Sequence, residues 1–96
     1  MRDYELLFVL DPAMEEEQRN AMVETVKGII NAEGEAGEAD LWGERKLAYP
    51  INKKKTGFYI LLPFKAEVTL PKELDRRLKI ADAVMRHIIV CTEQDA

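Results

Sequence analysis

Apolar and polar positions alternate at the start of the chain as they do in a β-strand. One face of residues 2–10 collects the alternate side chains Tyr4, Leu6, Phe8 and Leu10. Asp11-Pro12 interrupts this alternation, and apolar residues then recur at helical spacing as far as Gly34, a common helix terminator. The pattern predicts a strand over residues 2–10 and a helix over residues 14–33.

Two further runs with strand character follow this helix. They cover residues 36–51 and 57–67, and a polar turn at residues 53–56 separates them. Strands joined by so short a turn pair with each other, so we expect a β-hairpin here.

A short helix and a last strand complete the pattern. Pro71 suits the first turn of a helix, and Leu74 and Leu78 share one face of a helix over residues 71–81. Residues 84–92 are rich in β-branched types, which favour a strand.

The predicted order is therefore strand, helix, strand, strand, helix, strand. This order is typical of the ferredoxin-like βαββαβ fold, an α+β architecture in which a four-stranded antiparallel sheet carries two helices on one face. A chain of 96 residues is the size of one small domain. We predict a single domain over residues 1–93 and a short flexible tail over residues 94–96.

The strands are too apolar for a sheet with one face in water. We expect the helices to cover the face formed by Leu6, Phe8, Leu10, Phe58, Ile60, Leu62, Ile88 and Val90. The opposite face would still carry Leu7, Val9, Tyr59, Leu61, Ile89 and Cys91. A contiguous apolar patch of this kind usually marks a contact with another protein. A different strand register, or a twist that hides some of these side chains, is the alternative explanation.

Charge is distributed unevenly along the chain. The net charge is −4, but residues 1–41 hold a net −8, residues 42–65 a net +5 and the remainder −1. A positive segment on one hairpin of an acidic protein suits an anion such as a phosphate backbone. An ordinary solvated, lysine-rich turn would show the same pattern.

The chain lacks the residues of the common catalytic and metal sites. It contains no serine, and Cys91 and His87 are its sole cysteine and histidine, so neither a disulfide nor a zinc site with four N or S ligands can form within it. Cys91 and His87 are too far apart along a strand for a direct hydrogen bond, which argues against a thiol enzyme. We expect no enzymatic activity, no metal or other cofactor and no small-molecule substrate, and we interpret His87 as a structural residue.

Membrane insertion and secretion are not expected from this sequence. The longest apolar stretch, residues 58–64, is far shorter than the roughly 20 residues that a spanning helix needs. The N-terminal residues carry acids where a secretory signal needs a basic lead and an apolar core. We therefore expect a cytoplasmic protein.

The predicted hairpin contains a recognisable signature. The stretch reads Trp42-Gly43-Glu44-Arg45-Lys46-Leu47-Ala48-Tyr49-Pro50-Ile51-Asn52. It resembles the pattern of the small ribosomal subunit protein six family: Gly, any residue, a basic residue, a polar or charged residue, Leu, Ala or Ser, Tyr, any residue, Ile. Residues 1–5, 57–59, 73–76 and 84–87 resemble the same family in order and spacing.

This resemblance implies a non-enzymatic component of the small ribosomal subunit, located in the cytoplasm within the ribosome. It implies binding to the central domain of the small-subunit ribosomal RNA, together with ribosomal protein eighteen as a heterodimer partner. The candidate RNA-binding residues, matched by position, are Arg2, Arg45, Lys46, Lys53, Lys54 and Arg86. The candidate partner face remains Leu7, Val9, Tyr59, Leu61 and Ile89.

Three aromatic residues are open to more than one interpretation. Tyr4 and Tyr49 match positions near the RNA in the family, although Tyr49 is better interpreted as a core anchor of its strand. We interpret Trp42 as a packing anchor as well.

Two other functions are possible on this fold. One is a stand-alone RNA-recognition module that stacks bases on strand aromatics, but Phe58 and Tyr59 should point to opposite faces. The other is a small-molecule regulatory or acyl-phosphate-cleaving domain, which would need a phosphate-binding loop that the sequence does not show.

Overall fold

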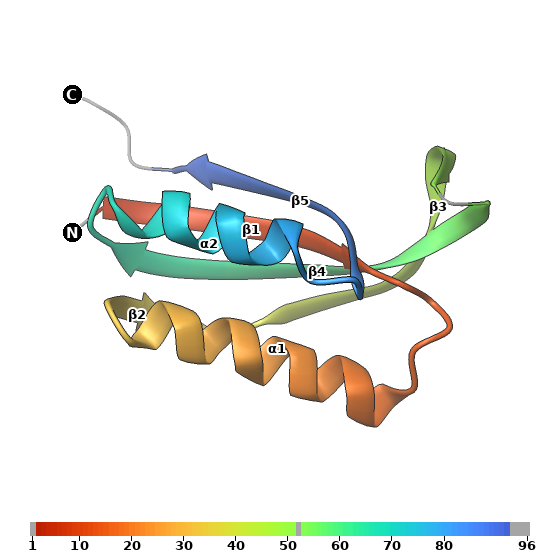
Figure 1. Cartoon of the computed structure of the whole chain (residues 1–96), viewed down its shortest axis with the longest axis horizontal. Helices are drawn as coiled ribbons and strands as arrows, with labels where there is room; N and C mark the ends of the chain where they lie inside the picture. The colour runs from red at the N-terminus through yellow and green to blue at the C-terminus, as the bar shows by residue number, and fades with distance from the viewer. Residues whose placement is uncertain (1, 52, 93–96) are drawn as a thin grey trace.

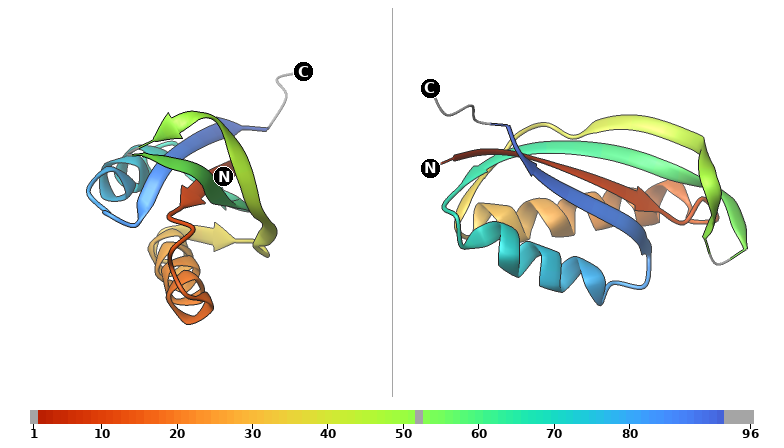
Figure 2. Two further views of the ribbon diagram at one scale, coloured as in Figure 1. Left: turned by 90° about the vertical axis from the view of Figure 1, so that its right-hand side faces the viewer. Right: turned by 90° about the horizontal axis from the view of Figure 1, so that it is seen from above.

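Two helices cover one face of an antiparallel sheet in the computed structural model, which describes residues 2–51 and 53–92 (Figure 1, Figure 2). The elements are β1 (Arg2–Leu10), α1 (Glu16–Asn31), β2 (Gly34–Ala36), β3 (Asp40–Ile51), β4 (Lys54–Ala66), α2 (Leu70–Lys79) and β5 (Val84–Cys91). The strands pair in the order β2-β4-β1-β5, and β3 also pairs with β4. The ferredoxin-like order is confirmed, with the second strand divided in two. The tail predicted at residues 94–96 lies outside the described residues.

The division of the second strand traces to its neighbour. The sequence pattern predicts one strand over residues 36–51, but β2 and β3 are separate and give the sheet five strands. Opposite the break stands Pro63 of β4, which has no N–H to donate. Its carbonyl oxygen accepts a hydrogen bond from the Gly37 N–H at 2.8 Å. Regular pairing of β2 with β4 stops next to this residue, and the register of β3 on β4 is shifted by one residue relative to β2.

The first helix is shorter than the apolar periodicity predicts. It begins at Glu16 rather than residue 14, because Asp11 holds the preceding segment in a turn: its carboxylate accepts from the Ala13 N–H at 2.9 Å. The Gln18 side chain then accepts from the Glu15 N–H at 3.1 Å, which satisfies one of the backbone donors at the helix start. Glu15, Glu16 and Glu17 at this end of the helix are exposed, as expected for carboxylates near the positive end of the helix dipole.

The hydrophobic core lies between the sheet and the helices. Even-numbered residues of β1 and β4 face it, since Leu6 pairs with Leu62 and Phe8 with Ile60. The side chains that close the core from the helices are Val23, Val26, Ile30, Leu70, Leu74 and Leu78. The predicted core faces of β1, β4 and the second helix are therefore confirmed.

The predicted faces of β5 are wrong. The register pairs Ile89 with core-facing Leu6, and Ile88 with Leu7. Ile89 packs against the core, whereas Ile88 and Val90 are 44% and 51% exposed on the opposite face. Because β5 is apolar at successive positions, its sequence does not distinguish its two faces. Its pairing with β1 decides which side chains face the core.

His87 joins β5 to the second helix. It pairs in register with Phe8, so its ring faces the helices, and its Nε2 lies 2.6 Å from the Asp75 Oδ1. The hydrogen bond from His87, followed by that from Lys79, lowers the pKa of Asp75. Two residues earlier, hydrogen bonds from Arg76 and then Arg77 lower the pKa of Glu73 from 4.5 to about 2.

These lowered carboxylate pKa values predict sensitivity to acid. A carboxylate whose pKa is depressed by folding stabilises the native state above its ordinary pKa, and that stabilisation is lost as the pH falls through the folded value. The free energy of unfolding, measured by urea titration, should therefore decline between pH 4.5 and about 2. Glu73→Gln should flatten this decline, whereas Glu17→Gln, at an exposed position of α1, should leave it in place. Equal pH profiles for all three proteins would contradict this expectation.

Candidate nucleic-acid and protein interface

The face of the sheet opposite the helices carries a continuous apolar patch. Odd-numbered residues of β1 and β4 point there, and the register places Leu7 between Leu61 on one side and Ile88 on the other. We call the following residues the outer patch: Leu7, Tyr59, Leu61, Ile88 and Val90. Val9 belongs to the same face but is only 4% exposed. The predicted partner residues of β1 and β4 thus share one surface, and Ile88 takes the place assigned to Ile89.

A hollow of about 200 Å³ opens within the outer patch. Its lining is formed by Leu7, Val9, Tyr59, Arg86 and Ile88. Four of these five side chains are predominantly apolar, and Arg86 supplies the one charged group. The hollow is therefore suited to an apolar side chain that enters next to a hydrogen-bond donor.

A basic hairpin extends from one end of this face. The β3–β4 hairpin projects past the end of β1, since β1 ends at Leu10 opposite Phe58 and β4 continues to Lys54 (Figure 1). Arg45 and Lys46 lie on its β3 side and are exposed. The opposite side carries Lys53, Lys54 and Lys55, of which Lys53 has a φ of 67° at the turn.

The structure groups most of the predicted RNA-binding residues but not all of them. Arg45, Lys46, Lys53 and Lys54 share the hairpin, and Arg86 lies beside it on β5. Arg2 lies at the opposite end of the sheet, where it pairs with Ala66. Arg2 is therefore not part of the surface that the other five predicted RNA-binding residues form.

The hairpin has a wide irregularity that bends it. Lys46 pairs with Thr56 and Ile51 with Lys54, so residues 47–50 stand opposite Lys55 alone. Pro50 suits this break because it cannot donate to the ladder. As Figure 2 shows, the hairpin curves across the end of the sheet toward β5.

Two contacts hold the bent hairpin against the outer face. Val9 and Leu47 both approach Gly57, where an added Cβ would overlap the Val9 Cγ1 and lie 3.4 Å from the Leu47 Cδ2. Farther along the hairpin, the Arg86 Nη1 donates a hydrogen bond to the Tyr49 hydroxyl at 3.1 Å. Gly57 thus permits a close approach that a side chain would prevent.

The aromatic residues divide between the core and the outer face. Tyr4 is buried and stacks on Phe64 with a centroid distance of 5.3 Å, so it is not available to stack on RNA bases. Tyr49 is 57% exposed, and its expected role as a core anchor is wrong because the irregularity in β3 turns it outward. Trp42 is a packing anchor on the outer face: it stacks on Tyr59 at 6.4 Å.

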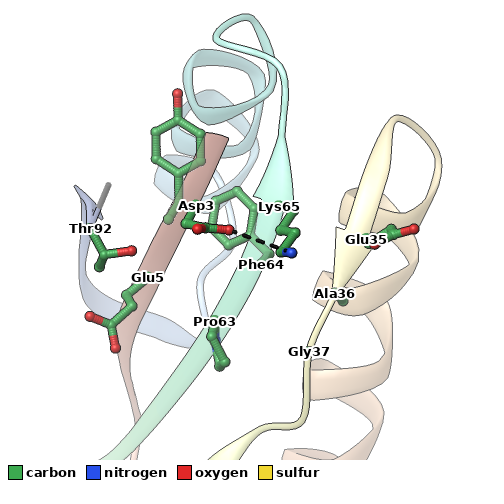
Figure 3. Close-up of a pocket in the computed structure, with 10 residues that line it drawn as sticks. Asp3, Glu5, Glu35, Ala36, Gly37, Pro63, Phe64, Lys65 and Thr92 are labelled. Atoms are coloured by element: carbon green, nitrogen blue, oxygen red, sulfur yellow. Dashed lines mark ion pairs between the residues drawn. The ribbon is translucent and has the colours of Figure 1, made fainter. Parts of the chain in front are cut away.

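The opposite end of the outer face is acidic. There a hollow of about 510 Å³ is lined by Asp3, Tyr4, Glu5, Glu35, Ala36, Gly37, Pro63, Phe64, Lys65 and Thr92 (Figure 3). Its lining holds three carboxylates and one ammonium group, the Lys65 Nζ, which lies 4.0 Å from the Asp3 Oδ1. This end repels phosphate, and the hairpin end attracts it.

Comparison with known proteins identifies the family. The model of the family described as Ribosomal protein S6 matches residues 3–91. The chain belongs to the ribosomal protein S6 family. Small ribosomal subunit protein bS6 of Clostridium botulinum (strain Langeland / NCTC 10281 / Type F) is 51% identical over 94 residues, which cover 97% of this chain and all of that relative. The same protein of Alkaliphilus metalliredigens (strain QYMF) is 49% identical over 90 residues, or 94% of this chain and 96% of the relative.

A solved structure agrees with this assignment. The crystal structure of 30S ribosomal protein S6 from Thermotoga maritima superposes with a TM-score of 0.87 at 30% sequence identity, covering 94% of this chain and 86% of that chain. This member of the S6 family is therefore a structural constituent of the small ribosomal subunit and not an enzyme. Within the described residues, no helix is long and apolar enough to cross a membrane.

Sequence reasoning missed part of this S6-family surface. The sequence pattern places Ile88 and Val90 in the core, and it gives no sign that the Arg45 guanidinium lies over the Trp42 ring, 5.5 Å from its centroid. Alternation along β1 and β4 could identify their outer residues, but β5 has no alternation to read. The Trp42 and Arg45 contact depends on the irregularity between Leu41 and Gly43, where the φ of Gly43 is +87°.

The contact over Gly57 gives a prediction about stability. Gly57→Ala should lower the free energy of unfolding by about 1 to 3 kcal/mol, since the new methyl group overlaps Val9. Adding Val9→Ala should recover part of that stability, because it removes the overlapping methyl groups. Urea unfolding of both single variants and the double variant measures the coupling between the two positions. If the changes in the free energy of unfolding caused by Gly57→Ala and Val9→Ala simply add in the double variant, the added methyl group does not clash with Val9.

Proposed function

We propose that this protein binds the central domain of the small-subunit ribosomal RNA as a heterodimer with ribosomal protein eighteen. The observation that carries the proposal is the position of the outer patch directly beside the basic hairpin on one face of the sheet. The patch would contact the protein partner, and the hairpin would contact the RNA backbone. The expected cytoplasmic location within the ribosome is part of the same proposal.

The outer patch has the chemistry of a protein contact. Ile88 and Val90 are about half exposed, and they adjoin Leu7 and Leu61 across paired strands. Phosphate groups are recognised by donors and positive charge, which aliphatic side chains do not supply. Covering these side chains removes apolar surface from water, which is worth about 25 cal/mol per Å² before the cost of association. A protein with an apolar surface of its own is therefore the better partner for this patch.

The hairpin has the chemistry of a phosphate contact. Five of the six basic residues of the segment 42–65 lie on the projecting hairpin, whereas the protein as a whole has a net charge of −4. Long-range attraction to RNA is therefore weak, and binding depends on local contacts of the hairpin. We infer that the protein alone binds RNA weakly and that a second protein adds the missing surface.

A stand-alone RNA-recognition module is less well supported. That mode needs exposed strand aromatics on which bases stack. On β4, Phe58 packs toward the core with the Arg19 guanidinium 4.2 Å from its ring centroid, and the Tyr59 ring is stacked under Trp42. Both aromatic faces that a base would need are thus already in contact with other side chains.

The lysine contribution can be measured by salt titration. Replacing Lys53, Lys54 and Lys55 together by Gln should reduce the slope of log affinity against log salt concentration by about 0.7 to 0.9 for each phosphate that the hairpin no longer neutralises. The measurement uses the assembled heterodimer and the ribosomal RNA. Replacement of Lys27, Lys72 and Lys79 by Gln is the matched control, since it changes the net charge equally on the helices. Equal slopes for the two triple variants would remove the lysine run from the RNA contact.

The partner face can be tested with two adjacent residues of β5. Ile88→Ser should weaken binding of the partner protein by about fivefold or more, as expected of a buried interface anchor, with little change in thermal stability. Ile89→Ser should instead lower stability by at least about 2 kcal/mol, because its side chain packs into the core. Calorimetry reports the affinity, and thermal unfolding reports the stability.

Two reference variants complete this test. Leu61→Ser should behave like Ile88→Ser, and Leu6→Ala should cost about 2 to 5 kcal/mol of stability as a large-to-small change at a fully buried position. Full partner affinity in both Ile88→Ser and Leu61→Ser would show that the partner binds elsewhere.

A further inference from the structure

We propose that Arg86 is a positioning residue that latches the basic hairpin through Tyr49, rather than a phosphate ligand of its own. This inference rests on the proposed function, in which the hairpin carries the RNA contacts. It assigns a different role to one of the residues matched to RNA binding, and it adds Tyr49 as the partner of that residue. The hydrogen bond between the Arg86 Nη1 and the Tyr49 hydroxyl, 3.1 Å long, is the direct evidence.

The hairpin needs such a latch because the sheet does not support its outer part. Beyond the pair of Leu10 with Phe58, β4 has no β1 residue beside it, and only β3 accompanies it. Within this two-stranded part, residues 47–50 leave the regular ladder. A two-stranded ribbon in water is only marginally stable by itself. Its direction must therefore be set by contacts between its side chains and the body of the protein.

Two successive contacts direct the hairpin toward the outer face, and an ion pair joins the Lys54 Nζ of the hairpin to the Asp11 Oδ1 at 3.6 Å. Nearer the body, Leu47 and Val9 are both buried, and both approach Gly57. Farther out, Tyr49 reaches across to Arg86, which is separated from it by 37 positions in the sequence. The apolar contact sets where the hairpin bends, and the hydrogen bond sets how far it turns toward β5 (Figure 2).

The position of Arg86 in the sheet explains why its side chain can hold Tyr49 in a fixed place. It pairs with Val9 in the ladder, and its side chain forms one wall of the hollow in the outer patch with Leu7 and Ile88. The stem of an arginine packs along apolar surface while its planar head remains available to donate. The irregularity at residues 47–50 of β3 brings the Tyr49 hydroxyl to the Arg86 guanidinium.

The latch would increase RNA affinity by preorganisation. A hairpin that is already held in its bound direction loses less conformational freedom on binding than one that swings. Breaking the latch should therefore weaken binding without removing a phosphate contact. That combination separates a positioning residue from a ligand: affinity falls, but the salt dependence does not change.

The test compares Tyr49→Phe, which removes one oxygen and no charge, with Arg86→Gln and the double variant. In the isolated protein, amide hydrogen exchange of residues 44–57 should become about two- to tenfold faster in each variant, the range that the loss of one hydrogen bond produces. The double variant should exchange no faster than the faster single variant, since both changes break the same contact. With the heterodimer and ribosomal RNA, both single variants should bind more weakly at an unchanged salt slope.

Two results would overturn the latch. One is unchanged hairpin exchange in Tyr49→Phe. The other is a reduced salt slope in Arg86→Gln together with full RNA affinity in Tyr49→Phe, which would make Arg86 a phosphate ligand. The exchange measurement needs no RNA, so it distinguishes failure of the latch from failure of the hairpin as an RNA-binding element, which the lysine titration tests separately.

Discussion

Pairing between β1 and β4 is the constraint on which the rest of the molecule depends. The two strands are in register along the whole of β1, from Arg2 opposite Ala66 to Leu10 opposite Phe58. Since successive side chains of a strand alternate between faces, this one register decides two surfaces at once. Leu6 and Phe8 enter the core, and Leu7 must then lie on the outer face. A shift of one residue would exchange the two sets, so the core and the outer patch cannot vary independently.

The length of β4 sets the position of the basic hairpin. It is longer than β1, which pairs with it only from Phe58 to Ala66. On its other side, β2 pairs near Ala66 and β3 pairs toward Lys54. The part that extends beyond β1 has room for basic side chains that are not buried by the sheet. Gly57 stands at the boundary, where the absence of a side chain lets Val9 and Leu47 approach the strand closely. The same strand thus forms the centre of the core and the base of the hairpin.

The sequence was informative where the pattern within an element determines its structure. Alternation identified both faces of β1 and β4, and helical spacing identified Leu74 and Leu78 as core residues. The sequence was insufficient where the local structure depends on a residue in another strand. Ile88 and Ile89 are chemically alike, and their faces follow from pairing with β1, which itself has an irregularity between Val9 and Leu10. The break between β2 and β3 likewise lies opposite Pro63, in a different strand. Tyr49 turns outward because four residues of β3 stand opposite one residue of β4, a count that no local pattern reveals.

The proposed protein and RNA surfaces are physically connected rather than merely adjacent. Arg86 borders the hollow in the outer patch and also donates to Tyr49 on the hairpin, and Tyr59 belongs to the patch while it supports Trp42. A partner that fills the hollow would press against the residue that holds the hairpin. Any resulting change in the order of the hairpin must then appear in the RNA affinity, and by reciprocity RNA would change the affinity for the partner by the same factor. Cooperative binding of the two ligands therefore needs no movement of the sheet, because the coupling passes through side chains that both sites share.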